Sequence, residues 1–142
     1  MYRHILIPTD GSKLAEHGVT HGLALAKSVG AKVSVIFVVE PFSEMTGRFL
    51  EAVAKYAELR KEQAVTTLDH AANEAKEKGI SCETIQVINA QPHQAIIAAA
   101  EEKGCDLIVM SSHGLSGLSM LLIGSVTNKV LTQAKIPVLV CQ

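Results

Sequence analysis

This sequence has few aromatic side chains and almost no net charge. It has no tryptophan, only 4% of its residues are aromatic, and its formal net charge is −1. Platforms for stacking nucleic-acid bases are therefore few, and a near-neutral chain has no electrostatic footprint for nucleic acid or an acidic membrane. These shortages argue against both partners. The core must be built from Ala, Val, Leu and Ile.

Long hydrophobic runs and paired cysteines are also missing. The apolar run near the N-terminus ends at Pro8 and Asp10, so it is too short for a signal sequence or a membrane span. The three cysteines, Cys82, Cys105 and Cys141, are odd in number and form no CxxC pair. We interpret them as reduced thiols and expect a cytoplasmic protein.

What the chain does contain is an alternating series of strand and helix patterns. Its 142 residues suit a single domain, which we take to span 1–142. Apolar or β-branched runs predict strands at 3–9, 32–39, 80–88, 105–110 and 136–141. Helical spacing, with glycines as stop signals and Pro92 as a start signal, predicts helices at 12–29, 48–78, 92–103 and 124–134.

This alternation is typical of βαβ crossovers, which make a sheet parallel and cover both of its faces with helices. We therefore predict an α/β fold with a doubly wound, five-stranded parallel sheet in the order 3-2-1-4-5. The winding then reverses between the first and fourth strands. Ligands of such sheets bind outside the carboxyl ends of the strands at that switch point, so the segments after these two strands are the candidate site.

The segment after the predicted fourth strand has the features of a phosphate loop. Gly114 lets the backbone approach a ligand, and Gly124 and Ser125 open the last helix. The N-terminal N–H groups and the dipole of a helix favour phosphate, and the hydroxyls of Ser125 and Thr127 would add donors. The spacing equally allows a structural loop in which Ser125 is the helix N-cap.

Asp10, after the first predicted strand, also has two readings. Its carboxylate could accept hydrogen bonds from a ribose or hold Mg²⁺ through water. It could instead cap the first helix, sharing that task with Ser12. The local sequence does not favour either role.

The machinery of rapid phosphoryl transfer is not recognisable. The chain has no GxxxxGK[ST] or GxGxxG motif, and no Lys or Arg stands between Lys103 and Lys129. Because fast transfer normally needs a positive clamp and Mg²⁺, the sequence favours binding over catalysis. We assign no catalytic or metal-binding residue. His113 has no evident acidic partner for a triad, and His17 and His21 lack a third metal ligand.

Four segments together resemble the universal stress protein superfamily: IPTDGS at the start, VMSSHG, LLIGSVTNKVL, and IPVLVCQ at the end. The resemblance covers the whole chain and implies the adenine nucleotide alpha hydrolase-like fold. The ATP-binding branch of the family has the pattern G-x2-G-x9-G-[ST], which is matched here at Gly114, Gly124 and Ser125. Ser111 stands where the pattern has its first glycine, and Leu115 stands where related sequences often carry a basic residue.

The resemblance implies a site for an adenine nucleotide, most simply ATP, alone or with Mg²⁺ or Mn²⁺. Asp10 would line the adenosine, Val38 would meet the adenine through its backbone, and the start of the last helix would cradle the phosphates. The full set of implied site residues is Pro8, Thr9, Asp10, Val38, Met110, Ser111, His113, Gly114, Gly124, Ser125, Val126 and Thr127. The resemblance also implies a homodimer through residues 136–141, an apolar edge strand that would be a liability if left bare.

Three functions therefore stay open. The chain could be a nucleotide-binding, stress-response regulatory protein in which hydrolysis is slow or absent. It could be a dimerisation or interaction module without nucleotide, which Ser111 would favour. It could also be a slow, Mg²⁺-dependent ATPase that uses Asp10.

Overall fold

The computed structural model describes residues 1–41, 50–113 and 123–142. Its strands are β1 (His4–Pro8), β2 (Lys32–Val39), β3 (Cys82–Ile88), β4 (Leu107–Ser111) and β5 (Val138–Cys141). Its helices are α1 (Lys13–Val29), α2 (Leu50–Glu77), α3 (Pro92–Lys103) and α4 (Ser125–Gln133). The last strand begins two residues later than predicted, after Pro137, which has no N–H to donate to a ladder.

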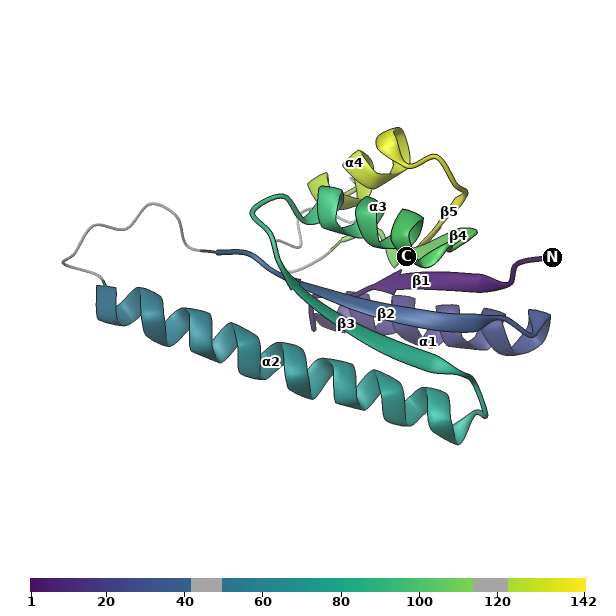
Figure 1. Ribbon diagram of the computed structural model, residues 1–142, viewed down its shortest axis with the longest axis horizontal. Helices are drawn as coiled ribbons and strands as arrows, with labels where there is room; N and C mark the ends of the chain where they lie inside the picture. Colours follow the sequence, from purple (N-terminus) through teal and green to yellow (C-terminus); the bar gives the residue numbers. More distant parts are fainter. Residues whose placement is uncertain (42–49, 114–122) are drawn as a thin grey trace.

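The sheet is five-stranded and parallel in the order β3-β2-β1-β4-β5, as predicted. Helices α1 and α2 cover one face and α3 and α4 cover the other (Figure 1). Two separate cores result. Along β1, successive side chains point to opposite faces. Ile5 and Ile7 therefore pack beneath α1 and α2, whereas Leu6 packs with Ile36 and Ile108 beneath α3 and α4.

The pairing between β1 and β4 is short, and this opens the switch point. The register links Ile5 with Leu107 and Leu6 with Ile108, although β1 continues to Pro8 and β4 to Ser111. By contrast, β1 and β2 stay paired up to Pro8 and Ile36. The carboxyl ends of β1 and β4 thus separate, which leaves room for a ligand where the winding reverses.

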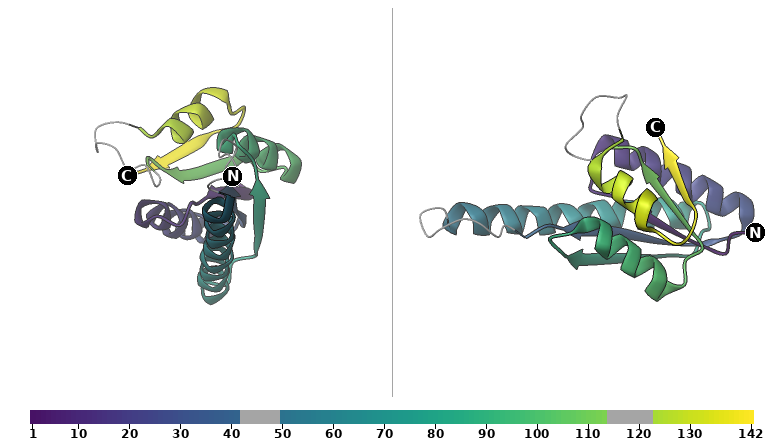
Figure 2. Two further views of the ribbon diagram at one scale, coloured as in Figure 1. Left: turned by 90° about the vertical axis from the view of Figure 1, so that its left-hand side faces the viewer. Right: turned by 90° about the horizontal axis from the view of Figure 1, so that it is seen from above.

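Helix α2 is much longer than the strand that it follows. Its 28 residues correspond to about 42 Å of helix, whereas the eight residues of β2 span about 26 Å. Its N-terminal part therefore extends past the carboxyl end of the sheet (Figures 1 and 2). Side chains on this part of α2 can reach the edge of the sheet where the switch point lies.

Candidate functional site

The turn after β1 is held by its own polar side chains. The Oδ1 atom of Asp10 accepts a hydrogen bond from the N–H of Ser12 (3.0 Å), and the Ser12 hydroxyl accepts one from the N–H of Ala15 (3.2 Å). Ser12 is therefore the N-cap of α1, and Asp10 orders the turn that leads to it. Gly11 adopts the left-handed region (φ 82°) that this sharp turn requires.

The segment after β4 is braced by three hydrogen bonds. The Ser111 hydroxyl donates to the carbonyl of His113 (2.7 Å), the Thr127 hydroxyl donates to the carbonyl of Ser111 (2.9 Å), and the N–H of Gly124 donates to the carbonyl of Ser112 (2.7 Å). The last two bonds tie the end of β4 to the start of α4. The Ser111 side chain is folded back onto the main chain of its own loop.

This geometry bears on two expectations for α4. The Thr127 hydroxyl donates its one proton to the carbonyl of Ser111, so its donation to a phosphate stays a prediction that requires this bond to be exchanged. Ser125 is not the N-cap, because Gly124 occupies that position with an extended backbone and Ser125 is the first helical residue. The N–H groups of Ser125, Val126 and Thr127 are the N-terminal donors that lack a carbonyl partner in their own helix.

One pocket brings the two segments together. It has a volume of about 230 Å³ and lies at the carboxyl ends of β1, β2 and β4. Every site residue implied by the sequence lines it except Gly114, which lies outside the described residues together with Leu115. Sequence reasoning missed six further lining residues: Ala15, Ile36, Glu40, Arg60, Pro92 and Ile96.

Some of the missed residues had a signal in the sequence and others had none. Ile36 stands two residues before Val38, so strand alternation places both on the same face. Pro92 and Ile96 are four apart and share a face of α3. Arg60 is different, because nothing in its local sequence distinguishes it from the other charged residues of α2. Only the packing of α2 against the sheet brings it to the pocket.

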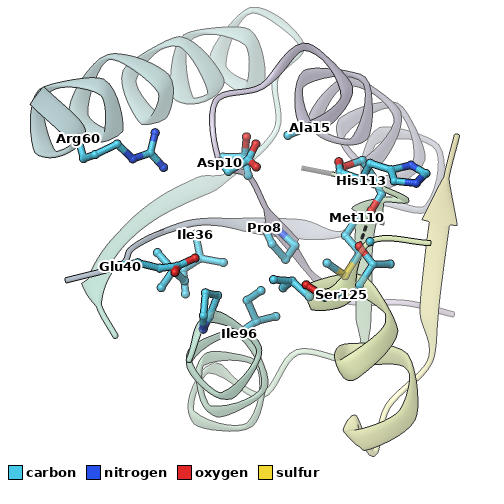
Figure 3. Close-up of a pocket in the computed structure, with 17 residues that line it drawn as sticks. Pro8, Asp10, Ala15, Ile36, Glu40, Arg60, Ile96, Met110, His113 and Ser125 are labelled. Carbon is cyan, nitrogen blue, oxygen red and sulfur yellow. Dashed lines mark hydrogen bonds between the residues drawn. The ribbon is translucent and has the colours of Figure 1, made fainter. Parts of the chain in front are cut away.

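The pocket has two chemically different ends (Figure 3). Met110, His113 and Ser125 lie on one side, next to the start of α4, which has no acidic residue in its first turn. Arg60 and Glu40 lie on the opposite side, and Asp10 stands between the two groups. Ile36, Ile96 and Pro8 form apolar walls between these ends. Charge is therefore distributed unevenly along the pocket.

His113 is buried, and only one of its two ring nitrogens has a hydrogen-bond partner among the described residues. It is 6% exposed, and its Nδ1 atom lies 3.0 Å from the Ser112 hydroxyl. Its Nε2 atom is buried and has no hydrogen-bond partner among the described residues. Figure 3 shows the imidazole directed away from the centre of the pocket, so the ring itself does not face the space between the other lining side chains. The partner of Nδ1 is a hydroxyl rather than a carboxylate, so the geometry is not that of a catalytic triad.

Side chains of metal-ligating types and cysteine thiols also occur among the described residues outside the pocket. In the part of the chain that the structure describes, no group of three His, Cys, Asp or Glu side chains could hold a metal ion. Burial raises the pKa of the Cys105 thiol to about 11 and also raises the pKa of Cys141, so both thiols have little thiolate character. Within 1–41, 50–113 and 123–142, no helix has the length and hydropathy of a membrane span.

Comparison with known proteins agrees with this geometry. A model of the universal stress protein family matches residues 1–142. Universal stress protein MJ0531 of Methanocaldococcus jannaschii is 36% identical over 141 residues, which cover 99% of this chain and 82% of that protein. The structure of the hypothetical protein MJ0577 from the same organism is 32% identical with a TM-score of 0.78, over 99% of this chain and 95% of that one.

A third relative carries a ligand. It is a universal stress protein whose crystal structure was solved in complex with cAMP, and it is 25% identical with a TM-score of 0.74 over 99% of this chain and 97% of that one. The fold and the pocket define a doubly wound α/β protein with an open helix N-terminus at its switch point. The chain belongs to the universal stress protein family.

Proposed function

We propose that this protein binds an adenine nucleotide, most simply ATP, in the switch-point pocket. The observation that carries the proposal is the N-terminus of α4, where three backbone N–H groups that lack a partner in their own helix meet the pocket. Such a terminus is an anion site through its donors and its dipole. The cAMP complex of a relative supports an adenine nucleotide as the occupant.

The chemistry of the pocket gives the ligand a direction. Its phosphates meet the start of α4, where the N–H groups of Ser125, Val126 and Thr127 donate to them. Its adenosine extends along the apolar walls formed by Ile36 and Ile96. The aliphatic walls exclude water from the faces of the base, which favours its burial.

Binding, rather than rapid turnover, fits the groups present. The α4 end of the pocket offers backbone N–H groups and hydroxyls and no described cation, and none of the described side chains there is a general base paired with an acid. The carboxyl group of Asp10 lines the pocket between its two ends and would suit Mg²⁺ or Mn²⁺ held through water. We infer a regulatory protein of the stress response, in the cytoplasm, that hydrolyses ATP slowly or not at all.

The test is mass spectrometry of the nucleotide released by denaturing freshly purified protein, followed by calorimetric titration with ATP and Mg²⁺. Bound adenine nucleotide, or a dissociation constant in the micromolar range, supports the proposal. A protein that is empty and gives no heat at millimolar ATP contradicts it and favours the interaction module without nucleotide.

The edge strand β5 supports a homodimer as the second part of this function. It pairs with β4 on one side and ends the sheet on the other, and its Leu139 side chain is 37% exposed. An apolar edge strand favours pairing with another chain. We expect light scattering to give twice the mass of the chain, and Leu139→Lys to shift the protein toward monomer. A monomeric wild-type protein at micromolar concentration would contradict the dimer.

A further inference from the structure

Arg60 stands in the pocket at the end opposite to α4, and its position is fixed from several sides. Its guanidinium lies over the ring of Phe37, with Cζ 5.0 Å from the ring centroid. Phe37 is completely buried, so this ring is a rigid platform for a cation–π contact. The Nη1 atom of Arg60 also donates a hydrogen bond to Oε1 of Gln63, one turn further along α2.

Gln63 in turn packs against the turn that follows β1. A Cβ atom placed on Gly11 would lie 2.8 Å from Nε2 of Gln63 and 3.0 Å from Oγ1 of Thr67, so α2 touches this turn without a gap. Arg60 is therefore connected through Gln63 to the same loop that presents Asp10. An arginine held by a stack and a hydrogen bond has lost much of its rotamer freedom before a ligand binds, which lowers the cost of a contact with that ligand.

A cation in a nucleotide pocket is usually expected to bind phosphate, but the surroundings of Arg60 do not favour that role. The carboxyl groups of Asp10 and Glu40 line the pocket at its centre and on the Arg60 side (Figure 3). A polyanionic chain placed there would meet two acidic side chains and one guanidinium. The first turn of α4 has no acidic residue, so phosphate is better placed at that end.

We propose that Arg60 contacts the base of the bound nucleotide, donating a hydrogen bond to a ring-nitrogen acceptor, and does not contact the phosphates. The inference rests on the proposed function and assigns a residue that selects the base to that same site. A guanidinium only donates, whereas the ring nitrogens of adenine only accept, so the two are complementary. The same contact disfavours bases that present a donor at this position.

The test compares adenosine, AMP and ATP as ligands of wild-type protein and of Arg60→Ala, by calorimetry. A lost hydrogen bond from a charged donor corresponds to about a tenfold loss of affinity. Because all three ligands share the base, we expect the same fold loss for each of them. Lys61→Ala is the matched control, since it removes the same charge from the neighbouring, exposed position of α2. It should leave all three affinities unchanged.

Arg60→Lys keeps the charge and the fold of α2 but loses the planar fork and the stack on Phe37, so it should lose affinity in the same pattern. Thermal melting of each variant establishes that it is folded. A loss confined to ATP, with adenosine unchanged, makes Arg60 a phosphate contact and overturns the inference. Equal affinities of wild type and both Arg60 variants also overturn it. A wild-type protein that binds none of the three ligands overturns the proposed function itself.

Discussion

The two ends of the parallel sheet carry the same kinds of polar side chain and use them in opposite ways. At the amino end, His4 of β1 and Ser34 of β2 are 6% and 0% exposed, and their Nε2 and Oγ atoms lie 2.7 Å apart. Ser34 donates to Oε1 of Glu83 on β3 (2.8 Å), and Nδ1 of His4 meets the carbonyl of Lys103 (3.1 Å). The carboxylate of Asp106 accepts a hydrogen bond from the N–H of His4 (3.0 Å), and we call these five residues the amino-end network.

At the carboxyl end, the Ser and His side chains are also hydrogen-bonded to the protein, but one ring nitrogen is left without a partner in the part of the chain that the structure describes. The Nδ1 atom of His113 meets a hydroxyl, but its Nε2 atom has no partner among the described residues. The backbone differs as well. The N-terminus of α4 opens onto this edge, whereas α1 and α3 end toward the other edge and are closed by Gly30 and Gly104 in the left-handed conformation.

This difference between the two edges of the sheet suggests that a polar side chain's role in this fold depends on the edge at which it lies. In a parallel sheet the helices enter at the carboxyl edge with unpaired N–H groups and leave at the amino edge with capped carbonyls. Polar residues at the amino edge find fixed protein partners and stabilise the fold. At the carboxyl edge the N–H groups at the start of α4 lack a carbonyl partner in their own helix, which is the feature that a ligand could use. The following predictions test this division.

The largest expected effect is a loss of ATP affinity in Gly124→Asp, at the carboxyl end of the sheet. Asp is a good N-cap residue and Gly124 has φ −60°, which Asp adopts freely, so we expect the melting temperature to be unchanged or slightly higher. Its carboxylate would repel the phosphates, and calorimetry should show affinity for ATP reduced roughly 100-fold. Gln133→Glu, with the same charge change at the far end of α4, is the control. Unchanged ATP affinity in Gly124→Asp would mean that the phosphates do not lie at this helix.

The next largest expected effect is a loss of stability in Ser34→Ala, in the amino-end network. The substitution removes the hydroxyl that joins His4 to Glu83 and leaves a buried ring nitrogen without its partner. We expect urea denaturation to give a free energy of unfolding lower by roughly 1–3 kcal/mol. Affinity for ATP should change less than about twofold, since the site is at the other edge. Ser28→Ala, an exposed position on α1, should affect neither quantity. A large loss of ATP affinity in Ser34→Ala would show that the two edges are coupled.

The buried side chain of His4 predicts that the free energy of unfolding depends on pH. Burial lowers its pKa, and Lys32 acts in the same direction, whereas the carbonyl of Lys103 and the charges of Glu83 and Asp106 oppose the shift. At a pH below the usual histidine pKa of about 6.5, His4 therefore binds a proton more readily in the unfolded chain than in the folded chain. The free energy of unfolding should fall as the pH is lowered through this value.

The comparison for this prediction is His4→Gln, which does not titrate. Glu83 and Asp106 have lowered pKa values through their hydrogen bonds, and the stability that they contribute is lost only at more acidic pH. The difference between wild type and His4→Gln in urea denaturation thus isolates the histidine. Parallel pH profiles for the two proteins between pH 7 and 5 would contradict the assignment.

The smallest effect is expected from Ser111→Gly, which restores the first glycine of the family pattern. The Ser111 hydroxyl donates to the carbonyl of His113, so its loss loosens the loop after β4. We expect a weakening of ATP affinity by less than about fivefold, corresponding to one neutral hydrogen bond. Tighter binding in the glycine variant would instead show that the serine side chain crowds the ligand.

The sequence by itself determined the element order, the parallel sheet and the position of the switch point. Strand runs, helical spacing, glycine stops and Pro92 are local signals, because each follows from the conformations that a few neighbouring residues prefer. The candidate phosphate-binding segment was predicted for the same reason, since the end of β4 and the start of α4 are close in the chain. The handedness rule for βαβ units then left few topologies to consider.

Only the tertiary structure decided which distant residues meet. Arg60 reaches the pocket because α2 is longer than the strand that it follows. Ser34 and Glu83 meet as register partners of β2 and β3, and His4 reaches Ser34 diagonally, because its own register partner on β2 is Lys32. The Thr127 hydroxyl was predicted as a phosphate donor, yet the approach of α4 to β4 directs its proton to Ser111. Local preferences specify helices and strands, but the contacts between them depend on lengths and registers that no short segment encodes.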